Sequence, residues 1–247
     1  MTLENSALPP KNLDHVDVWV FDLDNTLYSP QSRLFDQIDQ RIAEYVAKLL
    51  KIDVAAARAI QKDYFHRHGT SLRGLMMEHE IDPADYLDYV HNIDVSILSP
   101  NPALDRALAG LPGRKLIFTN GSVAHSHRVT DRLGISHHFE GVFDIAAAIY
   151  VPKPDVACYA KFLDQYSIDP KRCAMFEDTP RNLGPAAQLG MSTVLVRAPA
   201  DAALAWQIPT AGESWKDFVH HETDDLVSFL AESIKQRLMT LTSAANP

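Results

Sequence analysis

Cysteine is scarce in this sequence, with two residues among 247. Cys158 and Cys173 are too few for a disulfide framework, and they lack the spacing of zinc ligands. We therefore expect both thiols to be small core residues, and we expect the chain to work in a reducing, cytoplasmic setting.

Long apolar runs are also missing, because no stretch approaches the roughly 18 residues that a membrane-spanning helix needs. The start of the chain, MTLENSALPPKNLDH, is polar and has no basic segment followed by an apolar one. It therefore does not resemble a secretory signal, and it predicts a loose arm. We expect no membrane partner.

Positive charge is in the minority, since the formal net charge is −9. Proteins that bind a nucleic-acid polymer need a cationic surface to displace counterions, and this composition argues against such a partner. A small anionic ligand remains compatible with the sequence, because a few cations can act locally against the overall field.

What the sequence does contain is a series of short apolar runs that alternate with helical periodicity. The runs predict five buried strands at Val16–Phe21, Lys115–Thr119, Val142–Ile145, Cys173–Phe176 and Thr193–Val196. Helical spacing follows the later strands over 122–133, 155–166 and 180–189. This alternation predicts an α/β fold with a Rossmann-like, parallel five-stranded sheet flanked by helices.

The first two predicted strands are separated by roughly ninety residues, far more than one crossover helix needs. The intervening sequence is helical in pattern, with an apolar stripe that includes Leu34, Ile38 and Ile42. We therefore expect a helical cap domain over 29–98, inserted after the first strand, with 1–28 and 99–247 forming the α/β core domain. Within the cap, 69–74 is expected to be a polar turn between helices. A last helix is expected from 224 to about 238.

Two acids follow the first predicted strand, in the sequence Phe21-Asp22-Leu23-Asp24. Residues two apart in an extended chain point to the same side, so Asp22 and Asp24 are able to face one site. Two neighbouring carboxylates repel unless a cation or proton intervenes, and Mg²⁺ suits oxygen ligands. Alone, the pair is better explained by a turn in which one aspartate is a cap and the other is solvated.

Three other strand ends also carry polar groups. Thr119 and Asn120 precede a helix start, where a hydroxyl and free amides favour an anion. Lys153 lies between two prolines, and Glu177 and Asp178 form a second acidic pair. Because ligands bind beyond the carboxyl ends of parallel strands, these groups are expected to converge. Together they supply what phosphoryl transfer requires: a nucleophile, a metal site and cations or amides for phosphate oxygens.

The same ordered set resembles the haloacid dehalogenase superfamily, whose members are mostly phosphatases. The resemblance rests on Asp22, Asp24 and Thr26 in DLDNT, Thr119 in IFTNGS, Lys153 in VPKPD, and Glu177 and Asp178 in FEDTPRNL. It covers nearly the whole chain, and the inserted helices resemble the cap of that superfamily.

The resemblance implies a role for each of these residues. Asp22 would attack phosphorus, and Asp24 would protonate the leaving alkoxide and then activate water. Thr119 and the amide of Asn120 would hold phosphate oxygens, and Lys153 would offset their charge. The cofactor Mg²⁺ would bind Asp22, the backbone carbonyl of Asp24 and Asp178, with Glu177 as a direct or water-bridged ligand.

A finer likeness is to the pyrimidine 5′-nucleotidase-like branch, through FDLDNTLY, YFHRHGTSLRGL and HHETDDLVSFL. It implies a nucleoside 5′-monophosphate as the small-molecule partner. Arg73, Thr70 and His66, in or near the predicted cap turn, would then contact the base or sugar. An ordinary interhelical turn with solvated side chains fits this segment equally well.

Several functions are compatible with these residues. The leading hypothesis is a phosphatase of nucleoside 5′-monophosphates, working as a monomer or homodimer. A phosphomutase or a phosphatase of small sugar phosphates would use the same residues. A non-catalytic phospho-receiver also carries acids and a lysine at strand ends, but the long insertion and Asp24 argue against it.

Overall fold

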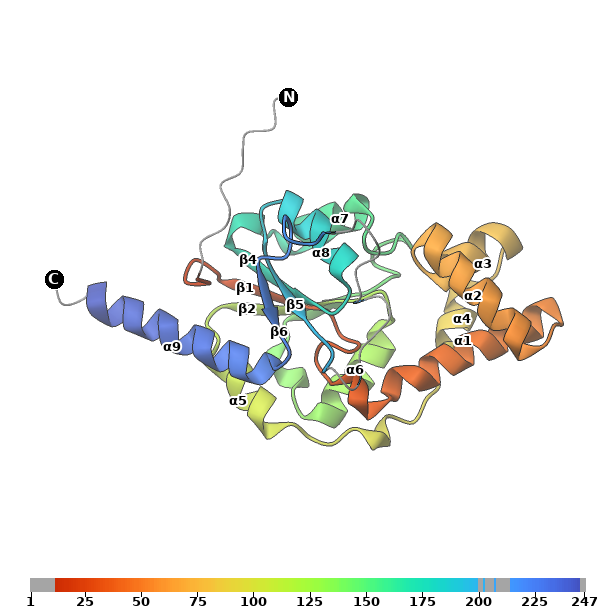
Figure 1. Cartoon of the computed structure of the whole chain (residues 1–247), viewed down its shortest axis with the longest axis horizontal. Helices are drawn as coiled ribbons and strands as arrows, with labels where there is room; N and C mark the ends of the chain where they lie inside the picture. The colour runs from red at the N-terminus through yellow and green to blue at the C-terminus, as the bar shows by residue number, and fades with distance from the viewer. Residues whose placement is uncertain (1–11, 200–201, 203–206, 208–213, 245–247) are drawn as a thin grey trace, which may run out of the picture.

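A six-stranded parallel sheet forms the centre of the protein (Figure 1). The computed structural model describes residues 12–199, 202, 207 and 214–244. The strands are β1 (Val18–Phe21), β2 (Arg114–Phe118), β3 (Gly141–Phe143), β4 (Cys173–Glu177), β5 (Ser192–Val196) and β6 (His221–Thr223). The first eleven residues of the expected N-terminal arm lie outside the described residues.

The order of the strands across the sheet is β3-β2-β1-β4-β5-β6. The α/β class and the five expected strands are confirmed. The sheet also has a sixth strand, which the sequence analysis does not predict. The missed strand, β6, lies at the edge of the sheet and pairs with β5 from Val194 opposite His221 to Val196 opposite Thr223. It is short and polar, so it lacks the apolar run that marks the strands with two neighbours.

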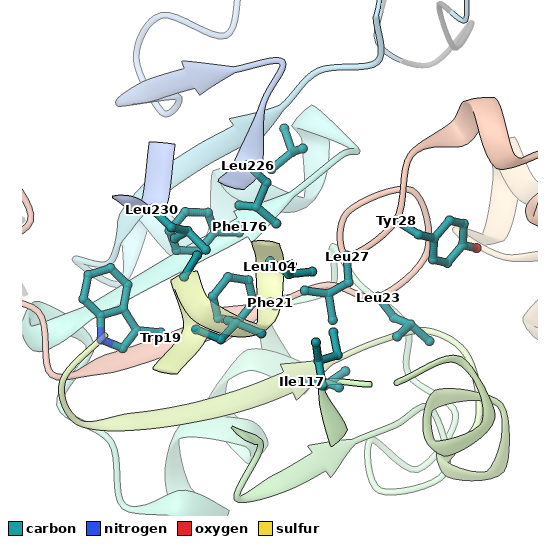
Figure 2. Packing of buried hydrophobic residues seen from close by; sticks show 14 of the residues in the cluster. Trp19, Phe21, Leu23, Leu27, Tyr28, Leu104, Ile117, Phe176, Leu226 and Leu230 are labelled. Carbon is teal, nitrogen blue, oxygen red and sulfur yellow. The ribbon is translucent and has the colours of Figure 1, made fainter. Parts of the chain in front are cut away.

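Helices cover both faces of this sheet, because alternate residues of each strand point to opposite sides. Trp19 and Phe21 of β1 belong to one hydrophobic cluster, and Val18 and Val20 belong to another. Figure 2 shows the first cluster, in which the ring of Phe21 stacks on Phe176 of β4 at 4.8 Å between centroids. The sheet is thus the middle layer of three.

The helices occupy three places in the fold. The first cluster is closed by α5 (Pro102–Gly110), α6 (Val123–Leu133) and α9 (Leu226–Ala244). The second is closed by α7 (Val156–Tyr166) and α8 (Pro180–Gln188). Four more follow β1 and lie to one side of the sheet in Figure 1: α1 (Leu34–Leu50), α2 (Val54–His68), α3 (Ser71–His79) and α4 (Pro83–Val90). Short 3₁₀ turns lie at Pro30–Ser32, Val95–Ile97, Ser136–His138 and Pro170–Arg172.

The helices α1 to α4 pack around a hydrophobic cluster of their own, which we call the cap cluster. Its buried members are Val46, Ala57, Tyr64, Leu72, Leu75, Tyr86, Leu87, Val90 and Ile145. All but Ile145 come from the four helices. Ile145 lies in the segment that follows β3, so the cap cluster also contains one residue of the α/β part of the chain.

The expected turn over 69–74 is corrected by the structure, because α3 begins within it. The side chain of Thr70 accepts a hydrogen bond from the backbone N–H of Arg73 at 3.2 Å and so caps the helix. Gly74 is helical, and a Cβ there would lie 2.6 Å from Cβ of Tyr64. That glycine therefore allows α2 and α3 to pack closely and does not mark a turn.

Both cysteines are buried and unpaired, as expected from the sequence. Among the described residues, no helix is both long and apolar enough to cross a membrane.

Candidate active site

The candidate nucleophile, Asp22, comes directly after β1 and continues the pairing of the sheet. Its backbone N–H donates to the carbonyl of Phe176 at 2.9 Å. The chain then turns sharply at Asn25, whose φ of 61° lies in the left-handed region that asparagine adopts more readily than most residues. This turn brings the hydroxyl of Thr26 back to Oδ2 of Asp22, at 3.2 Å. The DxDxT spacing therefore builds a loop that fixes the Asp22 carboxylate.

A buried ammonium group joins Asp22 to the second acidic pair. Lys153 is 1% exposed, and its Nζ donates to Oδ1 of Asp22 at 2.8 Å and to Oε2 of Glu177 at 2.6 Å. A third hydrogen bond goes to the carbonyl of Phe118, also at 2.8 Å. All three donor positions of the ammonium group are thus used, which gives it one orientation at the centre of the site.

The negative charges of Asp22 and Glu177 exceed the single positive charge of Lys153. Burial by itself lowers the pKa of Lys153, but the carboxylates of Asp22 and Glu177 outweigh burial and raise it. Burial and the neighbouring Glu177 raise the pKa of Asp22, and Lys153 offsets only part of that effect. One ammonium group is therefore too little positive charge for these carboxylates.

The acids fit a divalent metal ion. Asp22, Glu177 and Asp178 are all buried, and each offers a carboxylate oxygen within 4.8 Å of the others. Hard oxygen ligands and surplus negative charge are what Mg²⁺ requires. Thr179 hydrogen-bonds both acids of the pair, through its N–H to Oε1 of Glu177 at 3.0 Å and through its hydroxyl to Oδ1 of Asp178 at 3.1 Å.

The predicted phosphate-binding residues lie beside the lysine. Thr119 is buried, and its hydroxyl oxygen accepts a hydrogen bond from the N–H of Gly121 at 2.9 Å. The side chain of Asn120 makes two bonds to Lys153: its Oδ1 accepts from the backbone N–H at 2.9 Å, and its Nδ2 donates to the carbonyl at 3.3 Å. Asn120 therefore holds the lysine backbone, while the role of its own N–H toward phosphate stays a prediction.

The side chain of Asp24 belongs to a different set of contacts from Asp22. Its Oδ1 accepts hydrogen bonds from the hydroxyl of Tyr28 at 2.5 Å and from Nε2 of His125 at 2.8 Å. Burial alone would raise the pKa of Asp24, but the His125 and Tyr28 contacts outweigh burial and lower it. The carboxylate of Asp24 is not part of the cluster of Asp22, Glu177 and Asp178 that could hold a metal ion. The sequence prediction assigns the backbone carbonyl of Asp24 to the metal, and not its side chain.

Two histidines in this region were missed at the level of sequence. His125 of α6 is fully buried, and its ring stacks on that of His91 with 4.5 Å between centroids and 5° between planes. The signal for His125 was present, because it precedes Val129 and Leu133 by four and eight residues and so lies on the buried face of the helix. No comparable signal exists for His91, whose partner is distant in the sequence.

The three predicted cap residues lie in different surroundings. Arg73 forms an ion pair with Asp155 at 3.5 Å, which brings it to the loop that carries Lys153. Thr70 is used as the cap of α3, and His66 is exposed. Their contact with a substrate stays a prediction.

One further residue near the acidic pair was not predicted. The buried side chain of Gln207 donates to the backbone carbonyl of Asp178 at 2.7 Å and to that of Val196 at 3.1 Å. It therefore connects the end of β5 to the acidic pair at the end of β4.

Known proteins resemble this chain in sequence and in fold. A curated relative, Phosphate metabolism protein 8 of Saccharomyces cerevisiae (strain ATCC 204508 / S288c), is 28% identical over 213 residues, which are 77% of this chain. The chain spans 66% of the length of that relative, just under two thirds.

Two solved structures share the fold. A HAD phosphatase from Thermococcus onnurineus has a TM-score of 0.57 at 14% identity and covers 88% of this chain and 97% of its own. An L-2-haloacid dehalogenase from Xanthobacter autotrophicus, with chloropropionic acid covalently bound, has a TM-score of 0.54 at 18% identity and covers 87% of this chain and 97% of its own. At these identities the likeness shows the fold alone.

A family model described as haloacid dehalogenase-like hydrolase matches residues 16–190. The match includes all four groups of polar residues at the strand ends and extends over well more than half of the 247 residues. This chain belongs to the haloacid dehalogenase-like hydrolase family.

Proposed function

We propose that this hydrolase is a Mg²⁺-dependent phosphatase of phosphate monoesters, with Asp22 as its nucleophile. One observation carries the proposal: the buried Lys153 ammonium joins Asp22 to Glu177, and Asp178 lies within reach of the same oxygens. A carboxylate held against a cation, with more carboxylates for a metal, is suited to attack a phosphate dianion.

The reaction would proceed in two steps at Asp22. A carboxylate oxygen forms a bond to phosphorus, the bond to the ester oxygen breaks, and Asp24 gives the departing oxygen a proton. Water then attacks the aspartyl-phosphate and loses its proton to Asp24, which releases inorganic phosphate and restores both acids. Lys153 stays paired with Asp22 and Glu177 and limits the build-up of negative charge.

The metal would be held by Asp22, Asp178 and the backbone carbonyl of Asp24, with Glu177 directly or through water. Mg²⁺ bound there would neutralise charge on the phosphate oxygens. The family generally uses Mg²⁺. The raised pKa of Asp22 supports the proposal, because a nearby cation would return that carboxyl to its ionised form.

Family membership alone also allows dehalogenase chemistry, and Asp24 favours phosphate esters. A halide leaves without a proton, whereas an alkoxide needs one. Here an aspartate stands two residues after the nucleophile and is held by two hydrogen bonds. The name of the yeast relative, Phosphate metabolism protein 8, agrees with a phosphate substrate.

For the substrate class we propose nucleoside 5′-monophosphates, with pyrimidines favoured. The support is the sequence likeness to the nucleotidase branch and the position of Arg73 at the loop that carries Lys153. A guanidinium group there is able to stack on a base or hydrogen-bond it.

The test is a phosphate-release screen over nucleoside monophosphates and sugar phosphates, with Mg²⁺ and with EDTA. We expect release from nucleotides, dependence on Mg²⁺, and no activity in the Asp22→Asn variant. A preference for sugar phosphates would reject the nucleotide assignment, and isomerised sugar phosphate in place of free phosphate would indicate a mutase. Unchanged release by Asp22→Asn would reject the mechanism itself.

A further inference from the structure

The carboxylate of Asp24 is held from one side only. Both of its hydrogen bonds, from Tyr28 and from His125, end on Oδ1. A carboxylate oxygen that already accepts two hydrogen bonds has little capacity left for a proton. Oδ2 accepts no hydrogen bond from any of the described residues, so it is the oxygen on which Asp24 would carry a proton.

The His125 ring has little freedom to release Asp24. It is fully buried and stacks face to face on His91, which closes the end of α4. The hydroxyl of Ser122 accepts from the N–H of His125 at 3.3 Å and lies 3.0 Å from Nδ1 of His91. Nδ1 of His125 has no hydrogen-bond partner among the described residues. The hydrogen bond between Nε2 and Asp24 is therefore the one that the ring nitrogens make.

We propose that His125 is a positioning residue, which holds Oδ1 of Asp24 so that Oδ2 carries the proton for the leaving group. This inference rests on the proposed phosphatase function. It adds a second group to the first step: His125 does not touch the substrate and acts through Asp24. His91 stacks on His125 and lies at the end of α4. The position of the helices that follow β1 therefore affects the orientation of the Asp24 carboxylate.

The inference is tested by changing the leaving group. Phenyl phosphate and 4-nitrophenyl phosphate differ in the anion that departs, and nitrophenolate is stable enough to leave without a proton. The ratio kcat/KM reports the steps up to the breaking of the ester bond. Loss of the positioned acid should therefore lower kcat/KM for phenyl phosphate and spare 4-nitrophenyl phosphate.

For His125→Leu we expect kcat/KM on phenyl phosphate to fall by about 10²-fold, and on 4-nitrophenyl phosphate by less than about threefold. His125→Gln, whose amide is able to donate to Oδ1, should recover most of the loss. In an Asp24→Asn background, His125→Leu should add no further loss. The matched control is His127→Leu, which changes an exposed histidine on the same helix and should behave as wild type.

Tyr28→Phe keeps the ring but removes the other donor, and it should show the same dependence on the leaving group. This variant serves if His125→Leu folds poorly by thermal unfolding. An equal fall on both substrates, or an additive loss in the Asp24→Asn background, would overturn the positioning role alone. A wild-type protein that releases phosphate from neither ester and from no nucleoside monophosphate would overturn the proposed function together with this inference.

Discussion

Replacing His91 with phenylalanine should make the folded protein less sensitive to acid. The His91 ring is 8% exposed, and burial, followed by the neighbouring His125, lowers its pKa to about 3. Asp24 acts in the opposite direction, and Arg128 adds to the lowering. In the unfolded chain the same ring has its ordinary pKa of 6.5.

These two values set both the sign and the size of the effect. Between pH 6.5 and pH 3 the unfolded chain binds a proton at His91 that the folded protein refuses, so acid favours unfolding. The stability that depends on a neutral His91 is complete above pH 6.5 and is lost as the pH falls toward 3. Each pH unit in that window is worth about 1.4 kcal/mol, so the loss from pH 7 to pH 5 is about 2 kcal/mol.

The measurement is urea unfolding at pH 7, 6 and 5, followed by tryptophan fluorescence, since Trp19 and Trp215 are both buried. Other groups also titrate, so the quantity of interest is the difference between wild type and His91→Phe, which keeps an aromatic ring against His125. Wild type should lose about 2 kcal/mol more than the variant between pH 7 and pH 5. His127→Phe, at an exposed site, should follow wild type. Equal losses in wild type and His91→Phe would refute the reasoning.

Three further predictions concern the acidic site. Lys153→Met leaves Asp22 and Glu177 without their shared ammonium, so it should abolish phosphate release and lower the free energy of unfolding by about 3–5 kcal/mol; an unchanged urea midpoint would contradict this. Mg²⁺ at ten times its dissociation constant should stabilise wild type by about 1.4 kcal/mol in thermal unfolding, and a similar gain in Asp178→Asn would place the metal elsewhere. Gln207→Ala leaves the carbonyl of Asp178 without a buried donor and should cost about 1–3 kcal/mol by urea unfolding, whereas a loss within error would show that water replaces the amide.

The centre of the fold could be predicted because its strands are apolar runs in the sequence. All four residues of β1 and all five of β5 are buried, and only apolar or small side chains fit between two layers of helices. Parallel strands also bring their carboxyl ends to one edge. For that reason the meeting of Asp22, Lys153 and Glu177, far apart in the chain, followed from the order of the elements.

The features that were missed depend on contacts between distant segments. Gly74 suggested a turn, yet it is a point of close packing on Tyr64 that only the fold reveals. The contact of His91 with His125 joins the end of α4 to the first turn of α6, and no spacing in the sequence encodes it. Gln207 likewise donates to the backbone carbonyls of Asp178 and Val196, which are distant from it or from each other in the sequence, and no motif marks this contact.

The presence of Ile145 in the cap cluster bears on how this protein would be recombined with its relatives. Ile145 is 1% exposed, and Tyr150 from the same segment packs against the cluster. Cutting the chain at the two ends of the helical insertion would thus remove Ile145 from the cap cluster. The same cut would leave the side chain of Ile145 uncovered on the α/β part of the chain. A chimaera that imports new specificity should therefore carry two separate stretches of sequence, the helices and the segment after β3, exchanged as a pair.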